Sequence, residues 1–153
     1  MRKKIKMILD KEQIKKILPH REPFLLADTA TLSQDGMQAQ TSFYADPEMG
    51  IFKGHFPDEP VLPGAYIIEA MAQCAGIALL AGVCPSDQKP YLSSVSRMRF
   101  IRPVRPKDTL ICRASALEPG GAVQSGPDIY EFTVSAQVNA LQAAKGVITI
   151  TLR

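Results

Sequence analysis

The chain has 153 residues, of which 46% are hydrophobic, and its formal net charge is +3. This length suits one domain whose core needs neither disulfides nor metal ions, and the charge is too small to indicate nucleic-acid binding. We therefore predict a single domain, over residues 10–153. Residues 1–9 are predicted to be a basic N-terminal extension, which has too few apolar residues to be an export signal.

The cysteines give no sign of a disulfide or a metal site. Cys74, Cys84 and Cys112 make an odd number and lack a CxxC spacing. They are typical of reduced thiols in a cytoplasmic protein. The two histidines have no cysteine or histidine partner at zinc-ligand spacing, so we expect no metal and no cofactor.

The first third of the chain predicts a short helix and two strands. Asp10 is a suitable N-cap for a helix over Lys11–Leu18. The stretches Phe24–Leu32 and Met37–Ala45 predict two strands, and Asp35-Gly36 is a typical turn between them.

The last part of the chain predicts four more strands. They cover Tyr91–Arg102, Thr109–Leu117, Tyr130–Val138 and a final strand through Ile148–Leu152, with a glycine-rich hairpin loop over residues 118–128. Tyr130–Val138 alternates strictly between apolar and polar residues, so one face of that strand belongs to the core. Antiparallel strands around a single apolar helix predict an α+β domain in which the sheet curls over the helix.

That helix follows Pro63, which we expect to be its first helical residue. Residues 65–81 contain no Lys, Arg or Asp, so the helix is apolar nearly all round and should be buried. It is long enough for a membrane span, but Glu69 and Gln73 interrupt it and the remaining chain alternates like a soluble sheet. These two polar residues lie one turn apart, where Gln73 can orient Glu69.

Three groups near this helix could act together in chemistry. His55 lies in a proline-rich loop just upstream, and Gly64 offers an unhindered N–H in the first helical turn. With Glu69 they supply a base, an oxyanion donor and an acid, the set needed to remove a proton next to a carbonyl. The alternative is that Glu69 is only a structural carboxylate.

Five segments of the chain resemble the (3R)-hydroxyacyl-acyl-carrier-protein dehydratase family of bacterial type II fatty-acid synthesis. They are Leu18–Leu26, Gly54–Pro57, Pro63-Gly64, Ile68–Gln73 and the run from Tyr91 to Val104. The resemblance covers roughly residues 10–153 and implies a hotdog fold. It also implies a substrate chain carried on the phosphopantetheine of an acyl carrier protein. The family's isomerising branch has Asp in place of Glu69, which favours plain dehydration to a trans-2-enoyl thioester.

The resemblance also implies residue roles. His55 and Glu69 would be the catalytic pair, meeting across a homodimer that itself could form a trimer of dimers, and the Gly64 N–H would bind the thioester carbonyl. Tyr91 matches the position of a gating tyrosine but is equally natural as core cover. A basic group could dock an acidic carrier protein or be a solvated strand edge: Arg97, Arg99 and Arg102, continued by Arg105 and Lys107.

Several alternatives stay open at this point. Glu69 could protonate the leaving hydroxyl directly or orient a water that does so. The chain could instead be a hotdog thioesterase or a non-catalytic acyl-binding subunit, although His55 and Glu69 argue against both. Ser96-Arg97 replaces the family's usual Asp-Lys pair, which leaves housekeeping and specialised pathways both possible. We expect His20 to be a structural histidine satisfied by loop carbonyls.

Overall fold

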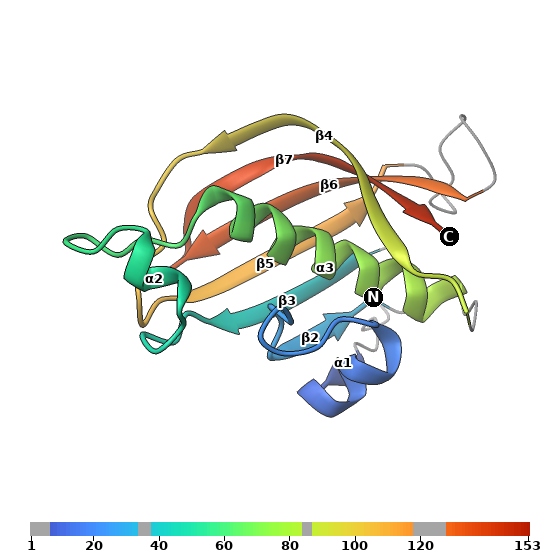
Figure 1. The fold of residues 1–153 in the computed structure, drawn as a ribbon. Helices are drawn as coiled ribbons and strands as arrows, with labels where there is room; N and C mark the ends of the chain where they lie inside the picture. The colour runs from blue at the N-terminus through green and yellow to red at the C-terminus, as the bar shows by residue number, and fades with distance from the viewer. Residues whose placement is uncertain (1–6, 34–37, 84–86, 118–127) are drawn as a thin grey trace.

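The computed structural model describes residues 7–33, 38–83, 87–117 and 128–153. In this part of the chain an antiparallel sheet curls around one long helix, α3 (Gly64–Val83), as Figure 1 shows. The strand order is β1-β2-β3-β5-β6-β7-β4. The strands are β1 (Met7–Leu9), β2 (Thr29–Leu32), β3 (Gln38–Tyr44), β4 (Pro90–Phe100), β5 (Thr109–Ala116), β6 (Ile129–Val138) and β7 (Leu141–Leu152). The predicted α+β fold, with a curled sheet around a central helix, is confirmed.

Helix α3 is the centre of the core. Every residue from Ala70 to Leu80 is buried, and the inward side chains of β5 and β6, including Leu110 and Phe132, are buried as well. Residues Gly64–Ala81 are long and apolar enough to cross a membrane, yet 67% of that window is buried inside the protein. Because the protein itself covers most of this apolar surface, we interpret α3 as a core helix and not as a membrane span.

Most predicted elements form close to their predicted bounds. Helix α1 (Lys11–Ile17) begins with a capping box, in which the side chains of Asp10 and Gln13 each accept from the other's backbone N–H. The predicted strand Phe24–Leu32 is wrong in its first half, since only Thr29–Leu32 pairs in the sheet as β2. The hairpin loop predicted for residues 118–128 lies almost wholly outside the described residues.

Two elements were not predicted. Met7–Leu9, within the predicted N-terminal extension, forms β1 and pairs with β2. The short helix α2 (Ile51–Gly54) immediately precedes His55. Both are too short for a periodic pattern to show in the sequence.

Strand β4 is one edge of the sheet, and β7 is its only neighbour in the described sheet. Its register shifts between Ser96 and Arg99, and Arg97 adopts a positive φ of 53° there. A side chain at Gly146 of β7 would come within 2.7 Å of Met98, so glycine lets this irregular part of β4 lie close to β7.

Candidate functional site

His55 is held in the loop between α2 and α3 by backbone contacts. Its Nδ1 lies 2.9 Å from the carbonyl oxygen of Val61. A carbonyl only accepts, so Nδ1 carries the proton and the Nε2 lone pair is free to act as a base. Phe56 stacks on the imidazole with ring centroids 4.1 Å apart, and reciprocal backbone bonds of 3.1 Å between Phe56 and Glu59 close the loop.

Gly64 is the first residue of α3. The carbonyl of Pro63 accepts from the N–H of Ile67 at 3.2 Å, which makes Pro63 the N-cap rather than the first helical residue that we predicted. Within the described residues the Gly64 N–H has no backbone acceptor, as expected at a helix N-terminus. A Cβ here would lie 2.9 Å from Cζ of Phe100, so the close approach of that ring favours glycine.

His55 and Gly64 line the same pocket, which we call the histidine pocket. Its volume is about 380 Å³. Its lining residues are His55, Val61, Leu62, Gly64, Ile67, Phe100, Ile101, Arg102 and Pro103. A base and a helix N-terminal donor therefore face one cavity, which suits removal of a proton next to a carbonyl.

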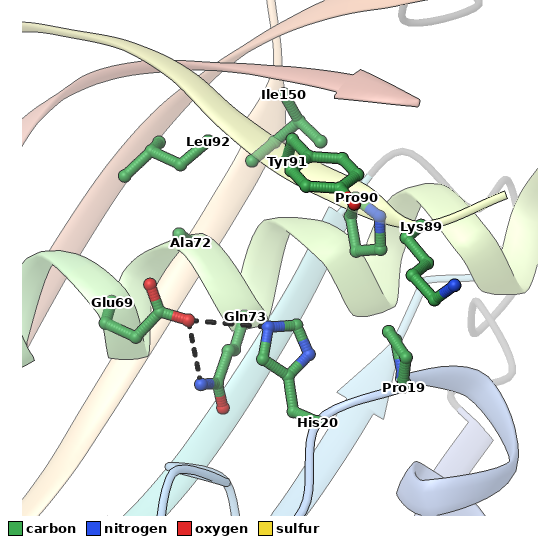
Figure 2. Close-up of a pocket in the computed structure, with 10 residues that line it drawn as sticks. All are labelled: Pro19, His20, Glu69, Ala72, Gln73, Lys89, Pro90, Tyr91, Leu92 and Ile150. Carbon is green, nitrogen blue, oxygen red and sulfur yellow. Dashed lines mark hydrogen bonds and ion pairs between the residues drawn. The ribbon is translucent and has the colours of Figure 1, made fainter. Parts of the chain in front are cut away.

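Glu69 lines a second cavity, the glutamate pocket, shown in Figure 2. It has a volume of about 400 Å³ and is lined by Pro19, His20, Glu69, Ala72, Gln73, Lys89, Pro90, Tyr91, Leu92 and Ile150. Oε1 of Glu69 accepts from Nε2 of Gln73 at 3.0 Å and lies 3.5 Å from Nε2 of His20. The other carboxylate oxygen points away from both donors, toward Ala72 and Leu92 in the view of Figure 2.

Gln73 joins α3 to the segment before β2. Only 1% of its surface is exposed, and its Nε2 also donates to the carbonyl of Phe24 at 2.7 Å. Its Oε1 accepts from the N–H of Leu26, also at 2.7 Å. These bonds replace sheet bonds for residues 24–26, which explains why that stretch is not a strand. The predicted hydrogen bond between Gln73 and Glu69 is present as well.

The expectation that loop carbonyls satisfy His20 is wrong. Its Nδ1 is buried without a hydrogen-bond partner in the described structure, and its Nε2 faces Glu69. Sequence reasoning missed this contact because His20 and Glu69 are far apart in the chain.

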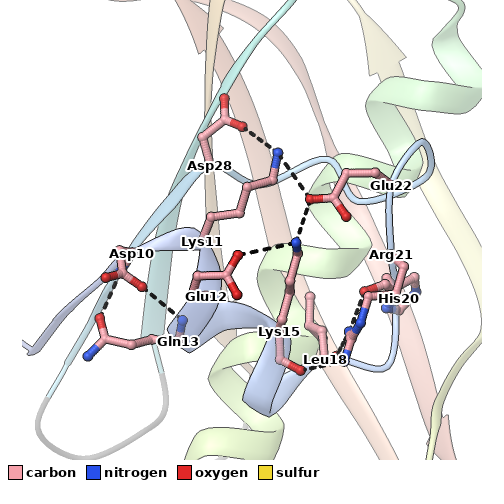
Figure 3. A network of polar contacts seen from close by, with 10 residues as sticks. All are labelled: Asp10, Lys11, Glu12, Gln13, Lys15, Leu18, His20, Arg21, Glu22 and Asp28. Atoms are coloured by element: carbon pink, nitrogen blue, oxygen red, sulfur yellow. Dashed lines mark hydrogen bonds and ion pairs between the residues drawn. The ribbon is translucent and has the colours of Figure 1, made fainter.

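The loop that carries His20 is held by a polar network, shown in Figure 3. The Arg21 guanidinium donates to the carbonyls of Leu18, at 2.9 Å, and Lys15, at 3.0 Å. Lys15 also pairs with Glu22 at 2.8 Å and lowers the pKa of that carboxyl from its usual 4.5 to about 2. The loop is thereby tied to the end of α1.

The structure keeps the two pockets apart within one protomer. No described residue lines both. An α-helix turns about 100° per residue, so Gly64 and Glu69 lie about 140° apart around α3. His55 and Gly64 are therefore brought together, Glu69 and Tyr91 are brought together, and the two sets face different cavities.

The basic residues predicted for carrier docking lie along and after β4. Arg97, Arg99 and Arg102 are exposed, and none forms an ion pair with a described residue. Arg102 lines the histidine pocket, whereas Arg105 lies 3.4 Å from Glu59 and is partly neutralised.

The cysteines are consistent with reduced core thiols. Cys74 and Cys112 are free and buried, and burial raises the pKa of the Cys74 thiol to about 12. The same cause raises the pKa of Cys112 well above its ordinary value. Such thiols are unreactive. Cys84 lies outside the described residues.

Comparison with known proteins identifies the family. Residues 31–140 match the model of the ApeI-like family, described as ApeI dehydratase. The chain belongs to the ApeI-like dehydratases.

The predicted relationship to (3R)-hydroxyacyl-acyl-carrier-protein dehydratases is also confirmed by curated relatives named 3-hydroxyacyl-acyl-carrier-protein dehydratase FabZ. The one from Oceanobacillus iheyensis is 34% identical, covering 95% of this chain and 100% of the relative. The one from Paracidovorax citrulli is 36% identical over 95% and 98% of the two chains.

A solved structure supports the fold of this family member. The dehydratase heterocomplex ApeI:P from Xenorhabdus doucetiae superposes with a TM-score of 0.71 at 16% identity, covering 92% of this chain and 90% of that one. At that identity the likeness concerns the fold alone, and the fold is the predicted hotdog arrangement.

Proposed function

We propose that this protein dehydrates (3R)-hydroxyacyl thioesters carried on acyl carrier protein to trans-2-enoyl thioesters, in cytoplasmic fatty-acid or related acyl-chain biosynthesis. The FabZ relatives, which match over nearly the whole chain, support the reaction class. The single observation that carries the proposal is the free Nε2 of His55 in one cavity with the N-terminal N–H of Gly64.

The first half of the reaction uses the histidine pocket. Nε2 of His55 takes the proton from C2 of the acyl chain, and negative charge develops on the thioester carbonyl oxygen. The Gly64 N–H donates to that oxygen at the positive end of α3. A donor of this kind is commonly worth about 3 kcal/mol in the transition state, because it binds charge that the substrate lacks.

The second half uses Glu69. The C3–O bond breaks, and the leaving hydroxyl takes a proton from the carboxyl, directly or through a water, to depart as water. The electron pair of the C2–H bond becomes the C2=C3 double bond. His55 then holds the proton from C2 and Glu69 is ionised, so transfer of one proton from the histidine to the carboxylate, through solvent, restores the starting state.

The separation of the pockets within one protomer supports a composite site. Strand β4 is an open sheet edge, and exposed apolar side chains lie along and just after it: Tyr91, Leu92, Val95, Phe100 and Ile101. Such an edge favours pairing with another strand. In a two-fold dimer formed through β4, His55 would work with the partner's Glu69. A further assembly of three such dimers remains a prediction from the family resemblance.

The exposed arginines suit an acidic carrier protein. Arg99 and Arg102 flank Phe100, whose ring lies against the helix N-terminus at Gly64. A carrier bound there could deliver its thioester into the histidine pocket, with Arg97 contributing to the same positive field. Tyr91 is 52% exposed on the wall of the glutamate pocket, which supports a role in gating the acyl chain.

The test is to incubate the protein with 3-hydroxyacyl thioesters of several lengths, on carrier protein and on coenzyme A. Enoyl product and free thiol are followed together. We expect enoyl product without thiol release. Free thiol without enoyl product would instead identify a thioesterase, and neither product across the series would indicate a non-catalytic acyl-binding subunit.

A further inference from the structure

We propose that His20 is a positioning residue, which together with Gln73 holds one oxygen of Glu69 so that the other faces the substrate. This inference rests on the proposed role of Glu69 in protonating the leaving hydroxyl. It concerns the glutamate pocket, where the side chains of His20, Glu69 and Gln73 meet (Figure 2).

The surroundings of the imidazole determine where its proton lies. Nδ1 of His20 is buried, and a proton there would have no acceptor among the described residues. Nε2 lies 3.5 Å from Oε1 of Glu69, and a proton on Nε2 therefore points toward a carboxylate. The ring is best satisfied with its proton on Nε2. At this distance the contact is long, and such contacts often tighten when substrate binds.

Two donors on one oxygen make the two oxygens of Glu69 unequal. Oε1 accepts from Nε2 of Gln73 at 3.0 Å and faces His20. Oε2 points away from both donors and is the oxygen available to carry the transferred proton (Figure 2). A carboxyl free to rotate would spend part of its time with its proton turned away from the substrate, so holding Oε1 favours the reactive orientation.

The polar contacts that shape the His20 loop do not involve the imidazole, whose ring stacks on Phe24 with centroids 6.5 Å apart. Arg21 binds the carbonyls of Leu18 and Lys15, and Gln73 binds the backbone on either side of Leu25. In the described residues the His20 ring donates to no backbone carbonyl, and its closest polar neighbour is Glu69. The side chain can therefore be changed while the polar contacts that shape the loop remain.

The experiment compares three substitutions of His20 in the full-length protein. His20→Gln places an amide N–H near the position of Nε2, whereas His20→Asn places it near Nδ1 and His20→Leu has no donor. We expect kcat to fall about 10- to 100-fold in the Asn and Leu variants, because each loses a hydrogen bond to a charged group, and KM to stay nearly unchanged. The Gln variant should keep most of the wild-type rate.

The same substitutions are then made with Glu69→Gln. If His20 acts through Glu69, His20→Leu should cause no further loss in that background. Wild-type kcat in both the Asn and Leu variants, a rise in KM alone, or an undiminished further loss beside Glu69→Gln would overturn the inference. Should the Leu variant fail to fold, the Asn and Gln pair decides. A wild-type rate in Glu69→Gln alone would overturn the proposed role of Glu69 instead.

Discussion

The histidine pocket and the glutamate pocket hold their proposed catalytic groups in different ways. His55 is fixed by a backbone carbonyl, and its companion donor is itself a backbone N–H at the start of α3. Glu69 instead contacts two side chains, accepting a hydrogen bond from Gln73 and lying 3.5 Å from His20. A group held by backbone atoms keeps its position when neighbouring side chains are substituted. A group held by side chains can lose its position through a single substitution.

The largest expected effect comes from removing either reactive group. His55→Ala and Glu69→Ala should each lower the dehydration rate by about 10²–10⁴-fold, as loss of a catalytic acid or base ordinarily does. Enoyl formation from a carrier-linked substrate measures this, with thermal unfolding as the control for folding. Retention of more than about a tenth of the wild-type rate by either variant would contradict the assignment.

Mixing the two inactive variants tests whether the pockets complete one another across a dimer. In a random equal mixture half of the dimers are mixed, and each has one intact site, so about a quarter of wild-type activity should return. The measurement is the dehydration rate after subunit exchange, with exchange shown independently by a tagged copy. Absence of recovery despite exchange would place the pair within one protomer.

Gln73 should matter for both stability and rate. Gln73→Leu leaves the buried N–H of Leu26 and the partly buried carbonyl of Phe24 without their partner, which should cost about 3 kcal/mol of unfolding free energy. Denaturant unfolding measures this cost, and the rate should fall because Glu69 loses a donor. Gln40→Leu, at an exposed position of β3, is the matched control and should change stability by less than about 0.5 kcal/mol. Equal losses in the two variants would argue against a special role for Gln73.

Charge removal near the histidine pocket should act on substrate capture. Arg99→Ala with Arg102→Ala should raise KM for carrier-linked substrate several-fold, more at low salt than at high salt, while kcat stays nearly unchanged. Turnover of a short coenzyme A thioester is the internal control. Arg113→Ala, which removes a positive charge from β5, should leave both substrates unaffected. Equal effects on both substrates would indicate that the carrier docks elsewhere.

The smallest expected effect concerns the loop behind the glutamate pocket. Lys15 holds the pKa of Glu22 at about 2, below its usual 4.5, so ionised Glu22 favours the folded state above about pH 4.5. That contribution should disappear as the pH falls toward 2. Glu22→Gln should therefore flatten the dependence of unfolding free energy on pH across this window. The exposed pair makes the change small, and identical pH profiles for variant and wild type would contradict it.

The sequence alone determined the features that depend on local pattern. The strict alternation of Tyr130–Val138 predicted β6, and the apolar run from Ala65 to Ala81 predicted the buried helix α3. His55 and Gly64 were predicted to act together, and the structure places them on one cavity because the loop between them is short and stiffened by prolines. Side-chain periodicity and short-range spacing carry this information, since neighbours in the chain are necessarily neighbours in space.

Only the tertiary structure decided which distant residues meet. Nothing in the alternation of Phe24–Leu32 shows that Gln73 binds the first part of that stretch and so limits β2 to its end. The contact of His20 with Glu69 depends on how the loop after α1 folds onto α3. Gly64 and Glu69 lie on different faces of α3. They line two separate cavities only because the sheet curls around the helix. These features arise from packing between elements, which no single stretch of sequence encodes.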